Sequence, residues 1–327
     1  MEQETMAAQT IETVGTDVLY DESVKRLLAN KSILAVILKE CVPEFKHCTT
    51  REIAEQYIEG EPQIGEVGIA PDETNRSGEV IHGLNTEDAI LTEGSIRYDI
   101  RFYASAPGED GLIGLIINLE AQNRFNPGYP LLKRAIYYCS RMNSAQYGAE
   151  FTKSEYGNIK KVYSIWICSN PPKDRRNTIT QYSIREEQIV GEAKEEVKNY
   201  DLMSAVMICL GEETDRNYSG LLKFLEVLLS DEKTAAAKKT ILQHEFDVPM
   251  TQTLETEVYQ MCNLSQGAIE KGIQKGIQKG YGQGREEERI ASVRNLMQNL
   301  HMTAEDAMKA LNVPQEDRDR IKQELAN

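Results

Sequence analysis

The sequence predicts an α/β domain, with a mixed central sheet flanked by helices, followed by a helical C-terminal region. Three observations carry this prediction. The middle of the 327-residue chain combines one stretch of alternating apolar residues with one continuous apolar run, and helical apolar spacing precedes and follows them. The resulting order of helix, hairpin, central strand, helix and strand is typical of an α/β fold with a mixed sheet. A composition of 40% hydrophobic and 27% charged residues excludes a wholly disordered or collagen-like chain.

The N-terminal quarter of the chain begins with a polar segment, residues 1–16, for which we expect a flexible conformation. Across residues 17–41 apolar side chains recur every three or four positions, which predicts helix. Asn30 interrupts this pattern and is predicted to cap a second helix. A short helix is expected over residues 51–57, whereas residues 60–87 carry too few apolar side chains for more than one or two short strands.

Strand patterns fill the middle of the chain. Residues 94–104 alternate between apolar and polar side chains, and a turn rich in Pro and Gly follows at 107–111. Residues 112–122 are almost wholly apolar, as expected of a central strand that is buried on both faces. A helix over 131–147 and a strand over 162–168 complete the pattern. One face of the first strand would carry Ile96, Tyr98, Ile100 and Phe102.

Beyond this core, the apolar run at 202–210 fits either a strand or a helix. Three helices are then predicted, over residues 219–229, 232–245 and 252–263. In the last segment, 290–325, we expect two short amphipathic helices, one capped by Thr303 and the other opened by Pro314. A helix-turn-helix is one interpretation of this pair.

A four-residue repeat of Gly with Lys begins at Gly267 and ends at Gly284. Each glycine lowers helix propensity by about 1 kcal/mol, but the row of glycines would leave a smooth helix face. No Gly-Lys-Ser/Thr sequence follows, which argues against a phosphate-binding loop. We therefore expect a hinge or an association helix.

The net charge of −15 argues at first against a nucleic acid partner. Residues 121–180, however, contain ten Lys and Arg against three Asp and Glu, so this window carries +7 and the remaining chain −22. A basic surface within an acidic protein indicates polyanion binding. The alternative is a solvated face without a partner.

The six cysteines are widely spaced and the four histidines are scattered, so neither a disulfide framework nor a zinc site is indicated. Buried thiols are the expected state of the cysteines, and any metal would be held mainly by oxygen. No apolar stretch approaches the roughly 20 residues that span a bilayer, and the N-terminus lacks the features of a signal peptide. We expect a soluble, cytoplasmic protein.

Candidate catalytic residues lie on the two central strands. Asp99 stands on the first, Glu120 ends the apolar run of the second, and Gln122 follows two positions later on the same strand face. If the strands pair as a hairpin, Asp99 comes within reach of the other two. Neighbouring carboxylates hold hard divalent cations such as Mg²⁺. A cation there would polarise a phosphodiester and lower the pKa of a bound water.

Asp99, Glu120-Ala-Gln122 and the segment from Tyr129 to Tyr138 resemble the PD-(D/E)XK nuclease superfamily. More narrowly, the chain is similar to the bacterial recombination-promoting nuclease/putative transposase group, also called PD-(D/E)XK nuclease family transposases. The resemblance runs from about Asp17 to about Cys209, and the Gly/Lys segment and closing helices are also similar. It implies a restriction-endonuclease-like core and a DNA endonuclease that depends on Mg²⁺ or Mn²⁺.

The resemblance also implies residue roles. Asp99 and Glu120 match the metal-binding acids, and Gln122 stands where the motif has its lysine. Because a glutamine supplies no positive charge, Lys133 or Arg134 on the next helix is a candidate substitute. On the opening helix, which carries Leu19-Tyr-Asp21 and Lys25, the sequence leaves two roles open for Asp21 and Glu22: the family's acid or simple helix capping.

The expected partner is double-stranded DNA, bound through phosphate contacts, together with a second copy of the chain through the Gly/Lys segment. An alternative is a catalytically inactive DNA-binding or assembly protein that keeps the nuclease fold. The predicted phosphate-contacting residues are Arg124, Lys133, Arg134 and Arg141. The predicted organisation is a flexible N-terminus (1–16), a nuclease-like domain (17–210), a helical extension (211–265), the Gly/Lys helix or hinge (266–289) and a helical pair (290–327).

Overall fold

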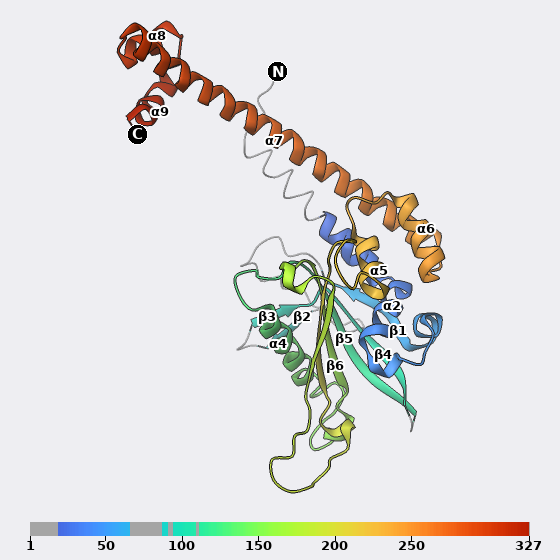
Figure 1. Cartoon of the computed structure of the whole chain (residues 1–327). Helices are drawn as coiled ribbons and strands as arrows, with labels where there is room; N and C mark the ends of the chain where they lie inside the picture. The colour runs from blue at the N-terminus through green and yellow to red at the C-terminus, as the bar shows by residue number, and fades with distance from the viewer. Residues whose placement is uncertain (1–18, 66–86, 91–93, 109–110, 327) are drawn as a thin grey trace. The chain divides into compact units, whose positions relative to one another are not determined.

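A computed structural model describes residues 19–65, 87–90, 94–108 and 111–326 (Figure 1). The chain divides into two compact units, residues 1–265 and 266–327. Segments 1–16 and most of 60–87, for which the sequence predicts little regular structure, lie largely outside the described residues.

A six-stranded sheet forms the centre of the first unit, with the strand order β1-β4-β5-β6-β8-β7. The pairs β5–β6 and β6–β8 are parallel, and the other neighbours are antiparallel. The predicted mixed α/β sheet is therefore confirmed, with β5 between β4 and β6 as its long central strand. The strands are β1 (Ile58–Ile64), β4 (Ile100–Gly108), β5 (Gly111–Arg124), β6 (Lys161–Asn170), β7 (Thr178–Ser183) and β8 (Met203–Cys209).

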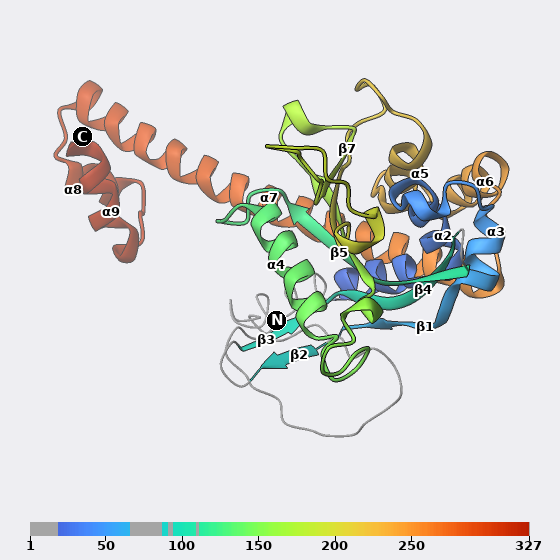
Figure 2. The same cartoon turned by 90° about the horizontal axis from the view of Figure 1, so that it is seen from below.

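Helices cover both faces of this sheet (Figures 1 and 2). Alternate residues of β5 divide between two cores: Leu115 and Ile117 join a cluster with α2 (Lys31–Cys41) and α5 (Gly220–Leu229), and Ile116 joins a cluster with α4 (Leu131–Ser144). This division follows from the period of two along a strand. Side chains of α6 (Ala235–Phe246) and of the first turns of α7 also enter the first cluster, so residues 211–265 share the core of the sheet.

The predicted N-terminal helices are confirmed. Residues 19–29 are helical, and the side chain of Asn30 caps α2 by accepting a hydrogen bond from the backbone amide of Ser32 at 3.0 Å. The predicted short helix corresponds to α3 and a following π-helical turn. The short helical elements of the described chain are η1 (Pro43–Phe45), α3 (Thr50–Glu52), the π-helical turn η2 (Ile53–Tyr57), η3 (Tyr156–Asn158), η4 (Lys173–Arg175) and η5 (Val197–Asn199).

The strand predicted over residues 94–104 is wrong in one respect, because the structure divides it. β3 (Gly94–Arg97) pairs with β2 (Glu87–Ile90) in a separate two-stranded sheet, and β4 begins only at Ile100. At the break, the buried ring of Tyr98 packs edge-on against Tyr138, with ring centroids 5.2 Å apart. The next backbone amide, that of Asp99, donates to a side chain instead of a strand carbonyl. Apolar alternation continues through such a break and therefore does not reveal it.

The run at 202–210, which the sequence left open, is strand β8. The edge strand β7 was not predicted, because its sequence, Thr-Ile-Thr-Gln-Tyr-Ser, has few apolar side chains to bury. All six cysteines are buried thiols, as expected. Within the described ranges, no helix is both long and apolar enough to cross a membrane.

The C-terminal part of the chain contains one long helix, α7 (Gln252–Leu300), which continues through the Gly/Lys repeat. Residues 290–300, with which the predicted helical pair was to begin, belong to α7, and the two predicted helices are α8 and α9. The predicted cap and start are confirmed: the Thr303 hydroxyl accepts from the amide of Asp306 at the start of α8 (Ala304–Ala310), and α9 (Gln315–Ala326) follows Pro314. The second unit has its own small core, formed by Val293, Ala307, Met308, Val313 and Ile321.

Candidate functional site

Asp99 and Glu120 lie side by side where β4 begins beside β5. The register pairs Ile100 with Leu119, so Asp99, directly before Ile100, lies opposite Glu120, directly after Leu119. The backbone amide of Asp99 donates to Oε1 of Glu120 at 3.1 Å, and the amide of Ala121 donates to Oδ2 of Asp99 at 3.1 Å. The expectation that a hairpin would bring these two acids together is confirmed.

The pair lies near the carboxyl end of the parallel strands. Glu120 pairs with Trp166 of β6, and both strands continue for four further residues, to Arg124 and Asn170. In open α/β sheets ligands bind outside this end of the strands. The side chain of Asp99 is 21% exposed, so solvent reaches the pair.

Burial governs the electrostatics of the two carboxyl groups. Glu120 is only 3% exposed, and burial, followed by repulsion from Asp99, raises its pKa well above the ordinary value. Oε1 of Glu120 also accepts from the side-chain amide of Asn118 at 2.9 Å. Burial raises the pKa of Asp99 as well, although its ion pair with Lys25 acts in the opposite direction. The pair therefore favours the binding of positive charge.

Lys25 contacts the acidic pair from the opening helix. Its Nζ lies 2.9 Å from Oδ1 of Asp99 and 2.9 Å from Oδ2 of Asp21, one helical turn away. Burial alone would lower the pKa of Lys25, but the two carboxylates outweigh this effect and raise it. No role for Lys25 was predicted from the sequence. The spacing of four residues between Asp21 and Lys25 was the one signal that could have linked them.

Of the two acids on the opening helix, Asp21 is the one that contacts the site. Residues 19 and 20 are already helical, so Asp21 stands inside the helix and does not cap its N-terminus. Glu22 instead forms an ion pair with Arg26 at 3.5 Å. Asp21, Lys25 and Asp99 thus alternate in charge, and Asp99 in turn contacts Glu120 through its backbone amide.

Gln122 and Arg134 border Glu120 on the α4 side of the sheet. Gln122 is half-buried and lies two positions after Glu120 on β5, opposite Cys168 of β6. The half-buried guanidinium of Arg134 donates to the hydroxyl of Tyr138, at 3.0 Å and 2.6 Å, and to that of Tyr129 at 2.8 Å. Burial and the nearby Glu120 raise the pKa of Tyr138 to about 12, so the phenol stays protonated.

The four residues predicted to contact DNA differ in how far they are exposed to solvent. Arg124 and Lys133 are exposed, and Arg134 is half-buried behind its tyrosine partners. Arg141 is only 3% exposed, with its guanidinium 3.2 Å from the hydroxyl of Tyr137, which corrects the prediction that it faces DNA. The reason is helical periodicity: Arg141 lies seven residues after Arg134 and shares the face of α4 that packs on the sheet.

Part of the basic window is neutralised within the fold. Lys161 forms ion pairs with Glu44 and Asp201 at 2.9 Å and 2.5 Å, and Arg176 forms pairs with Glu212 and Asp215 at 2.5 Å and 3.5 Å. The four acids come from outside residues 121–180. The charge that this window presents to a partner is therefore smaller than its sequence count.

Asp99 and Glu120 suit a magnesium-type cation. Mg²⁺ is commonly held by one or two carboxylates and completes its shell with water and substrate phosphate. The raised pKa values of both acids fit such a role, because a cation would relieve the cost of their buried charge. Among the residues that the structure describes, no group of three or more His, Cys, Asp and Glu side chains forms a fuller metal cluster.

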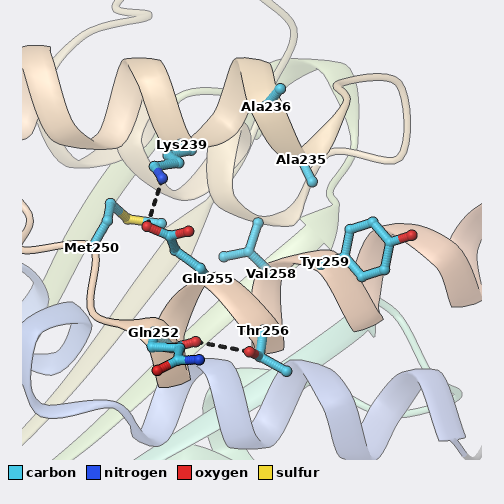
Figure 3. A pocket seen from close by; sticks show the side chains of 9 residues that line it. All are labelled: Ala235, Ala236, Lys239, Met250, Gln252, Glu255, Thr256, Val258 and Tyr259. Atoms are coloured by element: carbon cyan, nitrogen blue, oxygen red, sulfur yellow. Dashed lines mark hydrogen bonds and ion pairs between the residues drawn. The ribbon is translucent and has the colours of Figure 1, made fainter.

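A separate pocket of about 340 Å³ lies between α6 and the start of α7 (Figure 3). An ion pair of 2.6 Å between Lys239 and Glu255 borders it, and the aliphatic side chains of Met250 and Val258 contribute to its lining. The hydroxyl of Thr256 donates to the carbonyl oxygen of Gln252 at 2.8 Å. None of the acids around Asp99 lines this pocket, and its one ion pair offers no constellation of acids and bases for catalysis.

Comparison with known proteins finds no matching family model, no matching curated protein and no matching solved structure.

Proposed function

We propose that this chain is a metal-dependent endonuclease that hydrolyses phosphodiester bonds in double-stranded DNA. The observation that carries the proposal is the pair of carboxylates, Asp99 and Glu120, side by side near the carboxyl end of the parallel strands. The resemblance of Asp99 and Glu120-Ala-Gln122 to PD-(D/E)XK nuclease family transposases supports the same reading and suggests a role in recombination or in mobile elements.

In this proposal Asp99 and Glu120 would hold Mg²⁺ or Mn²⁺, which supplies Lewis acidity and lowers the pKa of a bound water. The chain itself fixes the geometry of its acids. Glu120 is held by the backbone amide of Asp99 and by Asn118, and Asp99 is held by the amide of Ala121. The side-chain amide of Gln122 orients water or a phosphate oxygen.

The proposed reaction is a hydrolysis. The water oxygen forms a bond to phosphorus while one phosphoester P–O bond breaks. The attacking water gives one proton to solvent, and the departing oxygen takes up a proton from solvent. The products are a phosphate monoester and a free hydroxyl group. The exposed Arg124 and Lys133 would neutralise neighbouring phosphates of the duplex.

The test is cleavage of supercoiled plasmid by the full chain with Mg²⁺ or Mn²⁺, in parallel with chelator. We expect nicked or linear product only with metal. Asp99→Asn and Glu120→Gln should each abolish cleavage and retain DNA binding, because both substitutions preserve shape and remove charge. Metal-independent cleavage, or cleavage by either variant at the wild-type rate, would contradict the proposal.

A second candidate is a catalytically inactive DNA-binding or assembly protein with the same fold. Gln122 favours it, since a neutral amide stands where the related motif has a lysine. Plasmid binding by the wild-type chain without cleavage under any metal condition would select this candidate over the nuclease.

A further inference from the structure

Lys25 is buried where the opening helix meets the acidic pair. Its side chain is 9% exposed, and Nζ lies 2.9 Å from a carboxylate oxygen of Asp99 and 2.9 Å from one of Asp21. Placing an ammonium group in a poorly solvated position costs free energy that only close opposite charge offsets. Two carboxylates from different parts of the chain provide that charge and fix the position of the ammonium.

Other positive side chains near Glu120 are less suited to act on a phosphate there. Arg134 donates both to Tyr138 and to Tyr129, so three of its N–H directions are already engaged. Lys133 is its neighbour on α4, is exposed, and therefore points to a different side of the helix. Gln122 carries no charge. Among the positive side chains that the structure describes, Lys25 is the one that forms an ion pair with a carboxylate of the pair, that of Asp99.

We infer that Lys25 is the catalytic cation of this site, taking from the opening helix the role for which Gln122 lacks a charge. This inference rests on the proposed nuclease function. The ammonium contacts the reacting phosphate or the attacking water beside Asp99, where it balances the negative charge that develops as the P–O bond breaks. Asp21 is a positioning residue, because it acts by holding Nζ of Lys25.

The test compares plasmid cleavage by full-length variants at saturating Mg²⁺, with melting temperatures measured for each. Lys25→Gln should lower the cleavage rate about a hundredfold to a thousandfold, the usual cost of removing one group that stabilises developing charge. Gln122→Lys alone should retain or raise cleavage. The double variant Lys25→Gln/Gln122→Lys should recover cleavage to within about tenfold of wild type, because the charge returns from the neighbouring strand.

Lys161 provides the matched control. Its side chain is 10% exposed and also lies between two carboxylates, those of Glu44 and Asp201, but at the start of β6. Lys161→Gln should lower the melting temperature to a similar extent and leave cleavage by the folded protein unchanged. A merely structural Lys25 would give the same result as Lys161 and would not respond to Gln122→Lys.

The outcomes separate the two proposals. Wild-type rates for Lys25→Gln, or a folded double variant that stays inactive, would overturn the role of Lys25 and leave the nuclease function intact. If Lys25→Gln does not fold at the assay temperature, two other variants provide the test. Lys25→Arg must cleave, because it keeps the charge and both ion pairs. The double variant, in its folded form, must also cleave. Absence of cleavage by the wild-type chain overturns both proposals.

Discussion

Asp99 and Glu120 are each held by the other's strand. The amide of Asp99 donates to Glu120 at 3.1 Å, and the amide of Ala121, directly after Glu120, donates to Asp99 at 3.1 Å. The distance between the two carboxylates is therefore set by backbone and not by flexible side chains. This arrangement holds two repelling groups together, which has consequences for stability with pH and with metal.

The first prediction is that the metal-free protein loses stability as the pH rises. Burial raises both pKa values above the ordinary 3.8 of Asp and 4.5 of Glu, so the folded state binds more protons than the unfolded state. The contribution of these groups to stability is fully present at and below the ordinary values and is lost as the pH rises through the raised ones. Each unit of raised pKa corresponds to about 1.4 kcal/mol. Thermal unfolding in chelator between acidic and neutral pH measures this slope.

Glu120→Gln should flatten that slope, since the amide oxygen can still accept the two hydrogen bonds while the titrating group is gone. Glu232→Gln, at an exposed position, is the control and should leave the slope as in wild type. An unchanged slope in Glu120→Gln would show that the pH dependence arises elsewhere.

The second prediction concerns metal binding. Mg²⁺ or Mn²⁺ should raise the melting temperature, because a ligand that binds only the folded state stabilises it by RT ln(1 + [L]/Kd), about 2.7 kcal/mol at one hundred times Kd. The gain should disappear in Asp99→Asn and in Glu120→Gln. Calorimetric titration of the metal alone into each variant provides a second measurement. Equal gains in wild type and both variants would place the metal at another site.

The caps and the central strand could be predicted because their signals are local. Asn30 and Thr303 cap helices through neighbouring amides, and the apolar run of β5 reports burial on both faces. The proximity of Asp99 and Glu120 followed from hairpin pairing alone. The position of Lys25 in the site could not be predicted, because its ion pair with Asp99 joins residues that lie 74 positions apart in the sequence. Likewise, the break before Ile100 depends on the packing of Tyr98 against α4.

The third prediction concerns DNA binding, which we expect to be electrostatic. Arg124→Ala and Lys133→Ala should each weaken binding to any duplex to a similar extent and lower the salt slope by about 0.9 per lost phosphate contact. Arg141→Ala should chiefly lower the melting temperature, because this side chain lies on the buried face of α4. Fluorescence anisotropy over a range of salt concentrations measures both quantities. Arg51→Ala, exposed and outside the basic window, is the control.

Full affinity in the Arg124→Ala/Lys133→Ala double variant would move the DNA surface away from the edge of the sheet. Binding should then be sought in the Gly/Lys segment of α7. Loss of DNA affinity in Arg141→Ala without any change in melting temperature would show that Arg141 contributes to DNA binding after all.

The last prediction is that the Gly/Lys segment of α7 mediates self-association. Ile273, Ile277 and Tyr281 recur every four residues on this helix and are 57%, 67% and 69% exposed. Gly276 and Gly280 follow the same spacing, and apart from the neighbouring residues and the adjoining helix backbone, a Cβ added at either would meet no atom within 4 Å. Within one chain, alanine at these glycines should stabilise the helix by up to about 1 kcal/mol each.

Association reverses that expectation, because a partner helix that approaches along the glycines would meet the new methyl groups. Gly276→Ala/Gly280→Ala should therefore raise helix content and lower the mass measured by light scattering, as should truncation after Asn263. Gly157→Ala, where an added Cβ also meets no atom within 4 Å, is the control outside α7 and should leave the mass unchanged. If the truncated chain and the double variant both keep the wild-type mass, the segment is a linker, and its exposed isoleucines serve another contact.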